Sequence, residues 1–240
     1  MKNYISVVNI TFLLILIFPL SIVAGNFILN LNILLIDIIG LFLIYQNRKK
    51  IKIDESLKYL LIFFIYLIFS SFFSKYQSTS ILKSLFFFKF FVFTLILIHI
   101  FELKQNYFKL FHLSLIFCLI FLSLDGLLQR FTGSNIFGWP MQSNRMTGLF
   151  KDEAVIGSYL SKFLFFGITY FYIFKDKVSK KKSFEIFILL ITFFAIINSG
   201  ERMATIHTLI GMTAYLLINL ITYKKKFFLI FIFLIVCIGF

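Results

Sequence analysis

Long apolar runs with few or no charged residues are the feature of this sequence that most restricts its fold. An α-helix rises about 1.5 Å per residue, so about 20 apolar residues cross a hydrocarbon layer about 30 Å thick. Strands of a membrane barrel would instead alternate apolar and polar residues over about ten positions, whereas these runs are continuous. The sequence therefore predicts an all-α fold, a polytopic bundle of transmembrane helices.

The composition excludes other broad classes of protein. Hydrophobic residues make up 60% of the 240 residues and charged residues 14%, with a mean hydropathy of +0.98. Soluble domains contain about 45–50% apolar and about 25% charged residues, and disordered chains are less hydrophobic still. Both cysteines, Cys118 and Cys237, lie in apolar runs, so neither a disulfide framework nor a cysteine metal site is expected.

About nine runs are long enough to be membrane spans within a single transmembrane domain. We place them at residues 7–24, 27–45, 59–73, 85–101, 110–128, 154–174, 184–197, 204–222 and 227–240. The first run follows Lys2, is longer than the apolar core of a signal peptide, and is followed at once by the second run. We therefore expect the first run to remain in the protein as a spanning helix.

Basic residues predict the orientation of these spans. The net charge is +14, but lysine and arginine occur in short clusters between apolar runs, unlike the basic face of a nucleic-acid-binding protein. Most of these clusters lie on the cytoplasmic side if the N-terminus is cytoplasmic. Three of the four arginines, Arg130, Arg145 and Arg202, then lie on the outer side, which indicates a need there for a planar, bidentate donor.

The longest outer connection covers residues 129–153 and contains the only tryptophan, Trp139. Trp139 is either an anchor at the membrane interface or a contact to substrate. Asp152 and Glu153 are expected in the first turn of a helix that starts near Asp152, where carboxylates interact favourably with the helix dipole. The alternative is that one of them pairs with an arginine or contacts a sugar hydroxyl.

A second outer segment, residues 198–203, predicts a tight turn after which Arg202 begins a helix. The N-terminus of a helix carries unpaired N–H groups and a partial positive charge. Together with a guanidinium group it suits a phosphate or pyrophosphate. The alternative role of Arg202 is an ion pair with Glu201 or Glu153.

Ionisable residues inside the spans are further candidates, because a charge at mid-bilayer costs at least about 2.5–3.5 kcal/mol. Asp125 lies about one turn before Arg130 and can orient it or line the same cavity. Lys162 and Asp37 lie deepest, and the alternative for them is to pair with each other. No cluster of His, Asp and Glu has the spacing of a metal site, so neither a metal nor another cofactor is expected.

Two motifs in the second half of the chain resemble the O-antigen ligase and O-antigen polymerase family, membrane glycosyltransferases of the GT-C class. The first motif is Arg145-x-x-Gly148-x-Phe150-x-Asp152-Glu153-x-x-x-Gly157-x-Tyr159-Leu160, and the second is Ser199-Gly200-Glu201-Arg202-x-Ala204. The resemblance is specific over roughly residues 125–215 and elsewhere is one of hydropathy alone.

The resemblance implies a role in lipopolysaccharide O-antigen biosynthesis at the periplasmic side of the bacterial inner membrane, in contact with membrane lipid. A glycan would pass from undecaprenyl pyrophosphate to lipid A–core or to a growing glycan chain, with no nucleic acid and no metal. Arg145 and Arg202 are implied to bind the donor pyrophosphate. Arg130 is expected in the same pocket because it is the third arginine on the predicted outer side. The supporting residues would be Asp125, Gly148, Tyr159, Lys162 and Gly200.

Acceptor attack needs a general base near the acceptor hydroxyl, and Asp152, Glu153 and Glu201 are the candidates in this chain. In the family this role belongs to a histidine on a large outer loop, which would follow the ninth run together with the last helices. We therefore expect a truncated family member that does not turn over alone. The alternatives to transfer are a transporter or flippase of lipid-linked sugars and a non-catalytic membrane subunit.

Overall fold

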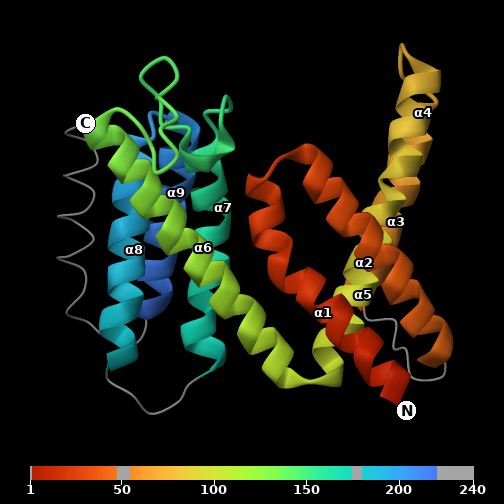
Figure 1. Ribbon diagram of the computed structural model, residues 1–240. Coiled ribbons are helices and arrows are strands. Elements are labelled where there is room, and N and C mark those ends of the chain that lie inside the picture. The colour runs from red at the N-terminus through yellow and green to blue at the C-terminus, as the bar shows by residue number, and fades with distance from the viewer. Residues whose placement is uncertain (1, 48–54, 175–179, 221–240) are drawn as a thin grey trace. The chain divides into compact units, whose positions relative to one another are not determined.

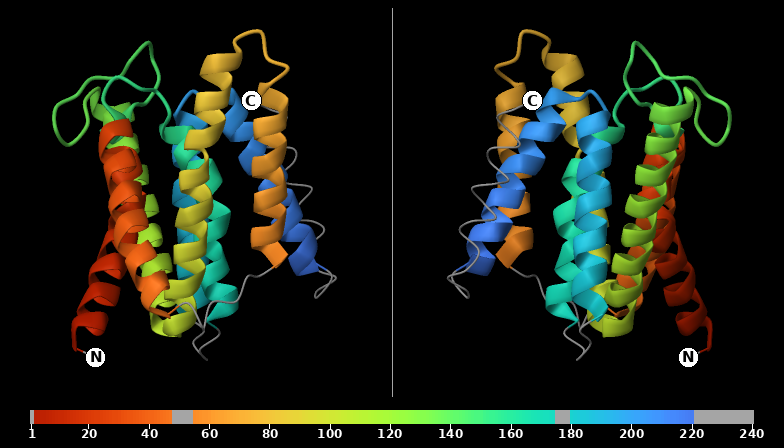
Figure 2. Two further views of the ribbon diagram at one scale, coloured as in Figure 1. Left: turned by 90° about the vertical axis from the view of Figure 1, so that its right-hand side faces the viewer. Right: turned by 90° about the vertical axis from the view of Figure 1, so that its left-hand side faces the viewer.

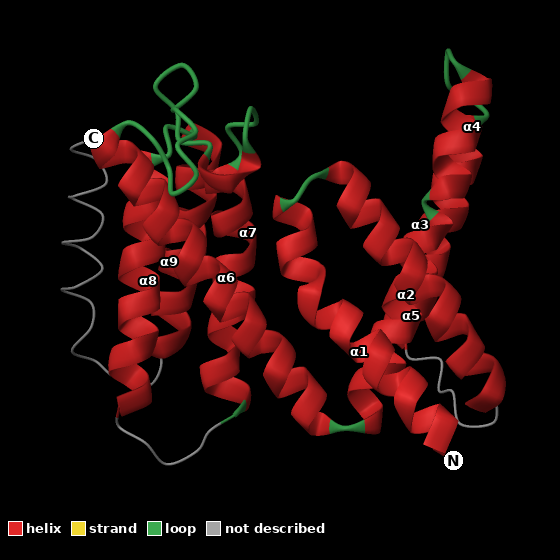
Figure 3. Ribbon diagram, viewed as in Figure 1, coloured by secondary structure: helices red, strands yellow, loops and turns green. Residues whose placement is uncertain are grey.

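The computed structural model describes residues 2–47, 55–174 and 180–220 of the chain. Every regular secondary-structure element in these ranges is a helix, and loops and turns connect the helices (Figure 3). The predicted all-α fold class is therefore confirmed for the described residues.

The chain divides into two compact units, with the boundary between Ser114 and Leu115 inside helix α6 (Gln105–Thr132). The helices of the first unit are α1 (Lys2–Val23), α2 (Asn26–Asn47), α3 (Glu55–Ser71), α4 (Gln77–Phe86) and α5 (Phe88–Leu103). Those of the second unit, after α6, are η2 (Gly148–Phe150), α7 (Ile156–Ile173), α8 (Lys180–Asn198) and α9 (Arg202–Leu220).

Each of the first eight predicted spans overlaps a helix, although the fourth, at 85–101, crosses the break between two helices, α4 and α5. The end of the eighth span and the whole of the ninth, at 227–240, lie outside the described residues. Among the described residues, four stretches are long and apolar enough to cross a membrane: Ser6–Val23, Asn26–Gln46, Gln77–Leu103 and Asn106–Thr132. The chain therefore has the helices of a membrane-embedded protein, but the predicted count of about nine spans is not confirmed.

The first unit is held together by aliphatic side chains of α1, α2 and α5. Ile15, Ile36 and Ile96 are fully or almost fully buried and belong to one apolar cluster. Tyr107, at the start of α6, stacks on Phe12 with 4.0 Å between the ring centroids and donates a hydrogen bond to the Asn9 side chain (2.7 Å). The buried Tyr107 hydroxyl thus has a hydrogen-bond partner, whereas Oδ1 of Asn32, Oδ1 of Asp37 and Nε2 of His99 are buried in this unit without one among the described residues.

The second unit is built around α7, which packs against α8 and α9 (Figures 1 and 2). Leu160 and Leu164 of α7 are fully buried, as are Leu119 of α6 and Ile196 of α8. The irregular segment 133–155 and the turn between α8 and α9 meet at one end of this unit (Figure 1). Both outer segments that the sequence singles out therefore occur together.

Candidate functional site

The segment after α6 is fixed to that helix by the fully buried side chain of Gln129. Its Nε2 donates to the carbonyl of Trp139 (3.1 Å) and to the hydroxyl of Thr147 (3.0 Å). Its Oε1 accepts the backbone N–H groups of Thr147 (2.9 Å) and Gly148 (2.8 Å). One side chain thus supplies the hydrogen bonds that a buried loop backbone cannot obtain from water.

Asn135 holds the next part of the segment. Its Oδ1 accepts the N–H groups of Phe137 (3.0 Å) and Trp139 (2.8 Å), and its Nδ2 donates to the carbonyl of Gly148 (2.8 Å). Such a side-chain turn replaces the backbone pairing that an irregular segment lacks. The Asn135 side chain therefore joins the first part of the loop to the backbone at Gly148.

Asp125 is 1% exposed and serves the same loop, since its Oδ1 accepts the N–H of Ile136 (3.0 Å). Its Oδ2 has no hydrogen-bond partner among the described residues. The guanidinium group of Arg130 instead donates to the carbonyl of Asn144 (3.3 Å). Asp125 therefore positions the loop backbone and does not orient Arg130 directly.

Two further positions from the first motif have packing roles. Gly148 has φ +53°, a conformation that favours glycine, and a Cβ there would lie 2.6 Å from Cδ1 of Ile156, so a larger residue would also require the Ile156 side chain to shift. Tyr159 is buried, with its ring 5.6 Å from that of Phe150 and 4.7 Å from that of Phe163. These residues shape the site and do not line an open surface.

A tight hairpin turn, residues 142–145, carries Arg145. Gln142 and Arg145 exchange backbone hydrogen bonds of 3.1 and 2.8 Å, and the two residues between them, Ser143 and Asn144, have φ of 48° and 61°. Positive φ at both central positions is typical of a type I′ turn, for which asparagine is well suited and serine less so. The turn places Gln142 and Arg145 directly opposite each other.

This hairpin turn is joined to the turn between α8 and α9. The N–H of Met146 donates to the carbonyl of Ser199 (3.2 Å). Gly200 has φ +78°, and a Cβ on it would lie 3.2 Å from Cγ of Arg145 and 3.8 Å from the carbonyl oxygen of Asn144. Glycine at this position thus lets Arg145 approach the segment in which Arg202 begins α9.

The carboxylate of Glu201 caps helix α7. Its Oε1 accepts the N–H of Gly157 (2.7 Å), and its Oε2 accepts the N–H (3.1 Å) and the hydroxyl (2.5 Å) of Ser158. These N–H groups are unpaired donors of the first helical turn, where a negative charge is favourable. Glu201 therefore has a structural role, for which both of its carboxylate oxygens accept hydrogen bonds.

The predicted capping role of Asp152 and Glu153 is wrong. Helix α7 begins at Ile156 and has no acidic residue in its first turn. Both carboxylates lie exposed in the turn that precedes the helix. The reason is that Glu201 reaches α7 from a residue 44 positions away and takes the place that they would occupy.

We call the place where the hairpin turn 142–145 meets the turn between α8 and α9 the junction. Arg145 and Arg202 lie in the segments that meet there, and Arg130 reaches the hairpin turn from α6. All three have exposed side chains and are called the arginine cluster below. Arg130 donates to the Asn144 carbonyl, Arg145 packs on Gly200, and Arg202 follows Gly200 by two residues. In the part of the chain that the structure describes, none of the three pairs with a carboxylate, so Arg202 does not pair with Glu201 or Glu153. Lys162 is exposed on α7, away from the hydrogen-bond network of the loop.

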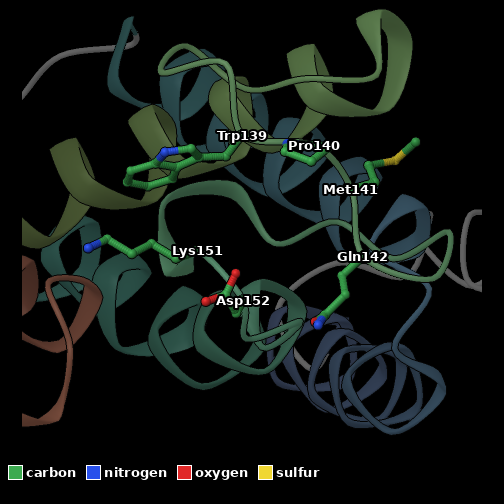
Figure 4. A pocket seen from close by; sticks show the side chains of 6 residues that line it. All are labelled: Trp139, Pro140, Met141, Gln142, Lys151 and Asp152. Atoms are coloured by element: carbon green, nitrogen blue, oxygen red, sulfur yellow. The ribbon is translucent and has the colours of Figure 1, made fainter.

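A hollow of about 310 Å³ adjoins the hairpin turn. Figure 4 shows Trp139, Pro140 and Met141 on one side of it and Lys151 and Asp152 on the other, with the Asp152 carboxylate directed into the space between. Gln142 closes one end. The ammonium group of Lys151 lies 5.6 Å from the centroid of the Trp139 ring. The sequence singles out only Trp139 and Asp152 among these residues.

No group of three or more His, Cys, Asp and Glu side chains that could hold a metal ion occurs among the described residues. Family models, curated proteins and solved structures offer no match to this chain. The resemblance to O-antigen ligases and polymerases therefore remains a prediction from the two motifs.

Replacing Gln129 by leucine should loosen segment 133–155. The change leaves the N–H groups of Thr147 and Gly148 without acceptors, at a cost of about 1–3 kcal/mol each. We expect trypsin to cleave after Arg145 and Lys151 several times faster in purified Gln129→Leu protein. The control is Gln77→Leu, which removes one exposed hydrogen bond (2.7 Å). Equal cleavage rates in all three proteins would contradict the role of Gln129.

Glu201→Ala should lower the thermal midpoint of the protein, because it removes the acceptor of three hydrogen bonds from the start of α7. The expected loss is about 1–3 kcal/mol. Glu201→Gln should fall between wild type and Glu201→Ala, since one amide oxygen remains. Circular dichroism measures the midpoint, with the exposed Glu153→Ala as a control that leaves it unchanged. A midpoint of Glu201→Ala equal to that of wild type would show that the cap is dispensable.

Proposed function

We propose that this chain binds the diphosphate of an undecaprenyl-pyrophosphate-linked glycan at the outer face of the bacterial inner membrane. The glycan is then transferred to a sugar acceptor, lipid A–core or a growing chain, in lipopolysaccharide O-antigen biosynthesis. The observation that supports this most directly is the packing of Arg145 against Gly200, two residues before Arg202. Two exposed arginines without a carboxylate partner among the described residues thereby lie in segments that meet at one helix N-terminus.

Diphosphate is the anion best matched to this arrangement. The first intrahelical hydrogen bond of α9 runs from the N–H of Thr205 to the carbonyl of Glu201 (3.1 Å), so the N–H groups of residues 202–204 have no acceptor within the helix and suit an anion. The N–H of Glu201 already donates to the Ser199 hydroxyl (3.2 Å). A guanidinium group binds phosphate oxygens in pairs. Arg130 adds a third positive charge through its contact with Asn144.

These charges suit transfer because of where negative charge develops. The bond between the anomeric carbon of the sugar and the diphosphate oxygen breaks, and the electron pair goes to that oxygen. The acceptor hydroxyl oxygen bonds to the same carbon and gives its proton to a base. Fixed cations beside the leaving diphosphate stabilise the charge that accumulates there.

Among the three candidate bases, Glu201 is the weakest because its oxygens already accept three hydrogen bonds. Asp152 and Glu153 are exposed, and Asp152 faces the hollow beside the junction (Figure 4). The arginine cluster binds and stabilises the leaving diphosphate and does not supply a base. A histidine acting as the base, as the resemblance implies, is therefore compatible with this arrangement.

Arg145→Ala and Arg202→Ala should each weaken binding of inorganic pyrophosphate to the purified protein by about tenfold to a hundredfold, the cost of losing a charged hydrogen-bonding pair. Lysine at either position should restore only a small part, because one ammonium group cannot reproduce the bidentate geometry. Isothermal calorimetry measures the affinity.

The matched control for these variants is Lys83→Ala, which removes an exposed positive charge on α4 in the first unit. It should leave pyrophosphate affinity unchanged. Wild-type affinity in both arginine variants would remove the basis of the proposal, and full rescue by lysine would remove the bidentate argument.

The orientation of the chain is tested by cysteine labelling. In a variant with Cys118→Ala and Cys237→Ser, we expect Ser143→Cys to react with a membrane-impermeant maleimide in intact cells stripped of their outer membrane. Lys104→Cys should react only after the membrane is opened, because it lies in a connection expected to be cytoplasmic. The reverse pattern would place the arginine cluster on the cytoplasmic side and contradict transfer at the outer face.

A further inference from the structure

We infer that the hollow between residues 139–142 and 151–152 is a subsite for one sugar ring, a role that rests on the diphosphate site proposed above. The hollow measures about 310 Å³. This is at the lower end of the range of about 300–1,000 Å³ in which small-molecule sites occur, so it suits a single ring and not an extended oligosaccharide.

The residues around the hollow combine an apolar face with several polar groups. Trp139 and Pro140 present the apolar side to the C–H groups of a sugar. The Asp152 carboxylate accepts hydrogen bonds from hydroxyl groups, and the Gln142 amide can both donate and accept them. The side chain of Lys151 is exposed, so its ammonium group can move from the Trp139 ring to a hydroxyl as a ring enters.

The charges of the hollow favour a neutral ligand. Lys151 and Asp152 carry opposite charges and lie next to each other in the chain. The carboxylate that faces the hollow would repel a free phosphate, whereas the neighbouring arginines attract one. The diphosphate and the hydroxyl-rich part of a lipid-linked glycan are therefore expected in adjacent but different places.

The hairpin turn provides this adjacency. Gln142 lines the hollow, and its backbone exchanges hydrogen bonds with Arg145 of the arginine cluster. The type I′ turn thus joins a residue that lines the hollow to an arginine that lies against Gly200. A sugar ring in the hollow lies beside a diphosphate held by Arg145, as either the donor sugar or the acceptor sugar of a transfer reaction.

The only tryptophan of the chain is Trp139, so intrinsic tryptophan emission comes from a single side chain, which lines this hollow. The experiment titrates the purified full chain, in an amine-oxide detergent that carries no sugar, with methyl glycosides of hexoses and N-acetylhexosamines. We expect at least one glycoside to change the emission in a saturable way at millimolar concentration. Asp152→Asn should weaken this response by about tenfold or more, the effect of losing a charged acceptor.

Controls separate this inference from the diphosphate proposal. The exposed carboxylate variant Glu102→Gln should leave the glycoside response unchanged. Arg145→Ala should weaken pyrophosphate binding as stated above and keep the glycoside response. If pyrophosphate binds as expected but no glycoside changes the emission, or if Asp152→Asn responds like wild type, the sugar subsite is wrong. If pyrophosphate does not bind, the proposed function fails whatever the glycosides do.

A short-chain prenyl pyrophosphate linked to the responding sugar distinguishes the two possible sources of the ring. If the hollow holds the donor sugar, this compound changes the emission of Trp139 and abolishes the further response to the methyl glycoside. If the hollow holds the acceptor sugar, the glycoside response persists after the compound has saturated its site. Either result supports a sugar subsite and assigns it to one substrate.

Discussion

The carboxylate of Glu201 at the start of α7 is the interaction on which the junction depends. Its oxygens accept hydrogen bonds from the backbone of Gly157 and Ser158, 44 and 43 residues away in the chain. A negative charge at unpaired helical N–H groups is favourable, and α7 has no acidic residue of its own there. The carboxylate thereby fixes the turn between α8 and α9 against the beginning of α7.

The arginine cluster follows from this fixed turn. Once Ser199 and Gly200 are in place, the Ser199 carbonyl accepts the N–H of Met146, and Gly200 leaves room for Arg145. The loop that carries Arg145 is held from its other side by the buried Gln129. The backbone segments that carry the arginines are therefore held by neutral side chains and one remote carboxylate, and the arginine side chains are exposed.

Sequence reasoning succeeds here where the signal is local. Continuous apolar runs predict helices because backbone groups in a membrane must be paired within one segment, and the sequence Asn-Ser-Gly predicts the turn after residue 198. It fails where a single polar side chain acts over a long distance. The sequence predicts a start of α7 near Asp152, because carboxylates close in sequence usually cap helices, whereas Glu201 is the residue that caps this helix. No sequence pattern distinguishes Gln129 and Asn135 from other polar residues near a helix end, so their roles in holding the loop could not be predicted.

The measurement that tests the central claim most directly is a cryo-electron microscopy map of the full chain in the presence of pyrophosphate. The account predicts density for the anion between the side chains of Arg145 and Arg202, beside Gly200 and the first turn of α9. Density elsewhere, or guanidinium groups of Arg145 and Arg202 directed away from each other with no anion between them, would contradict it.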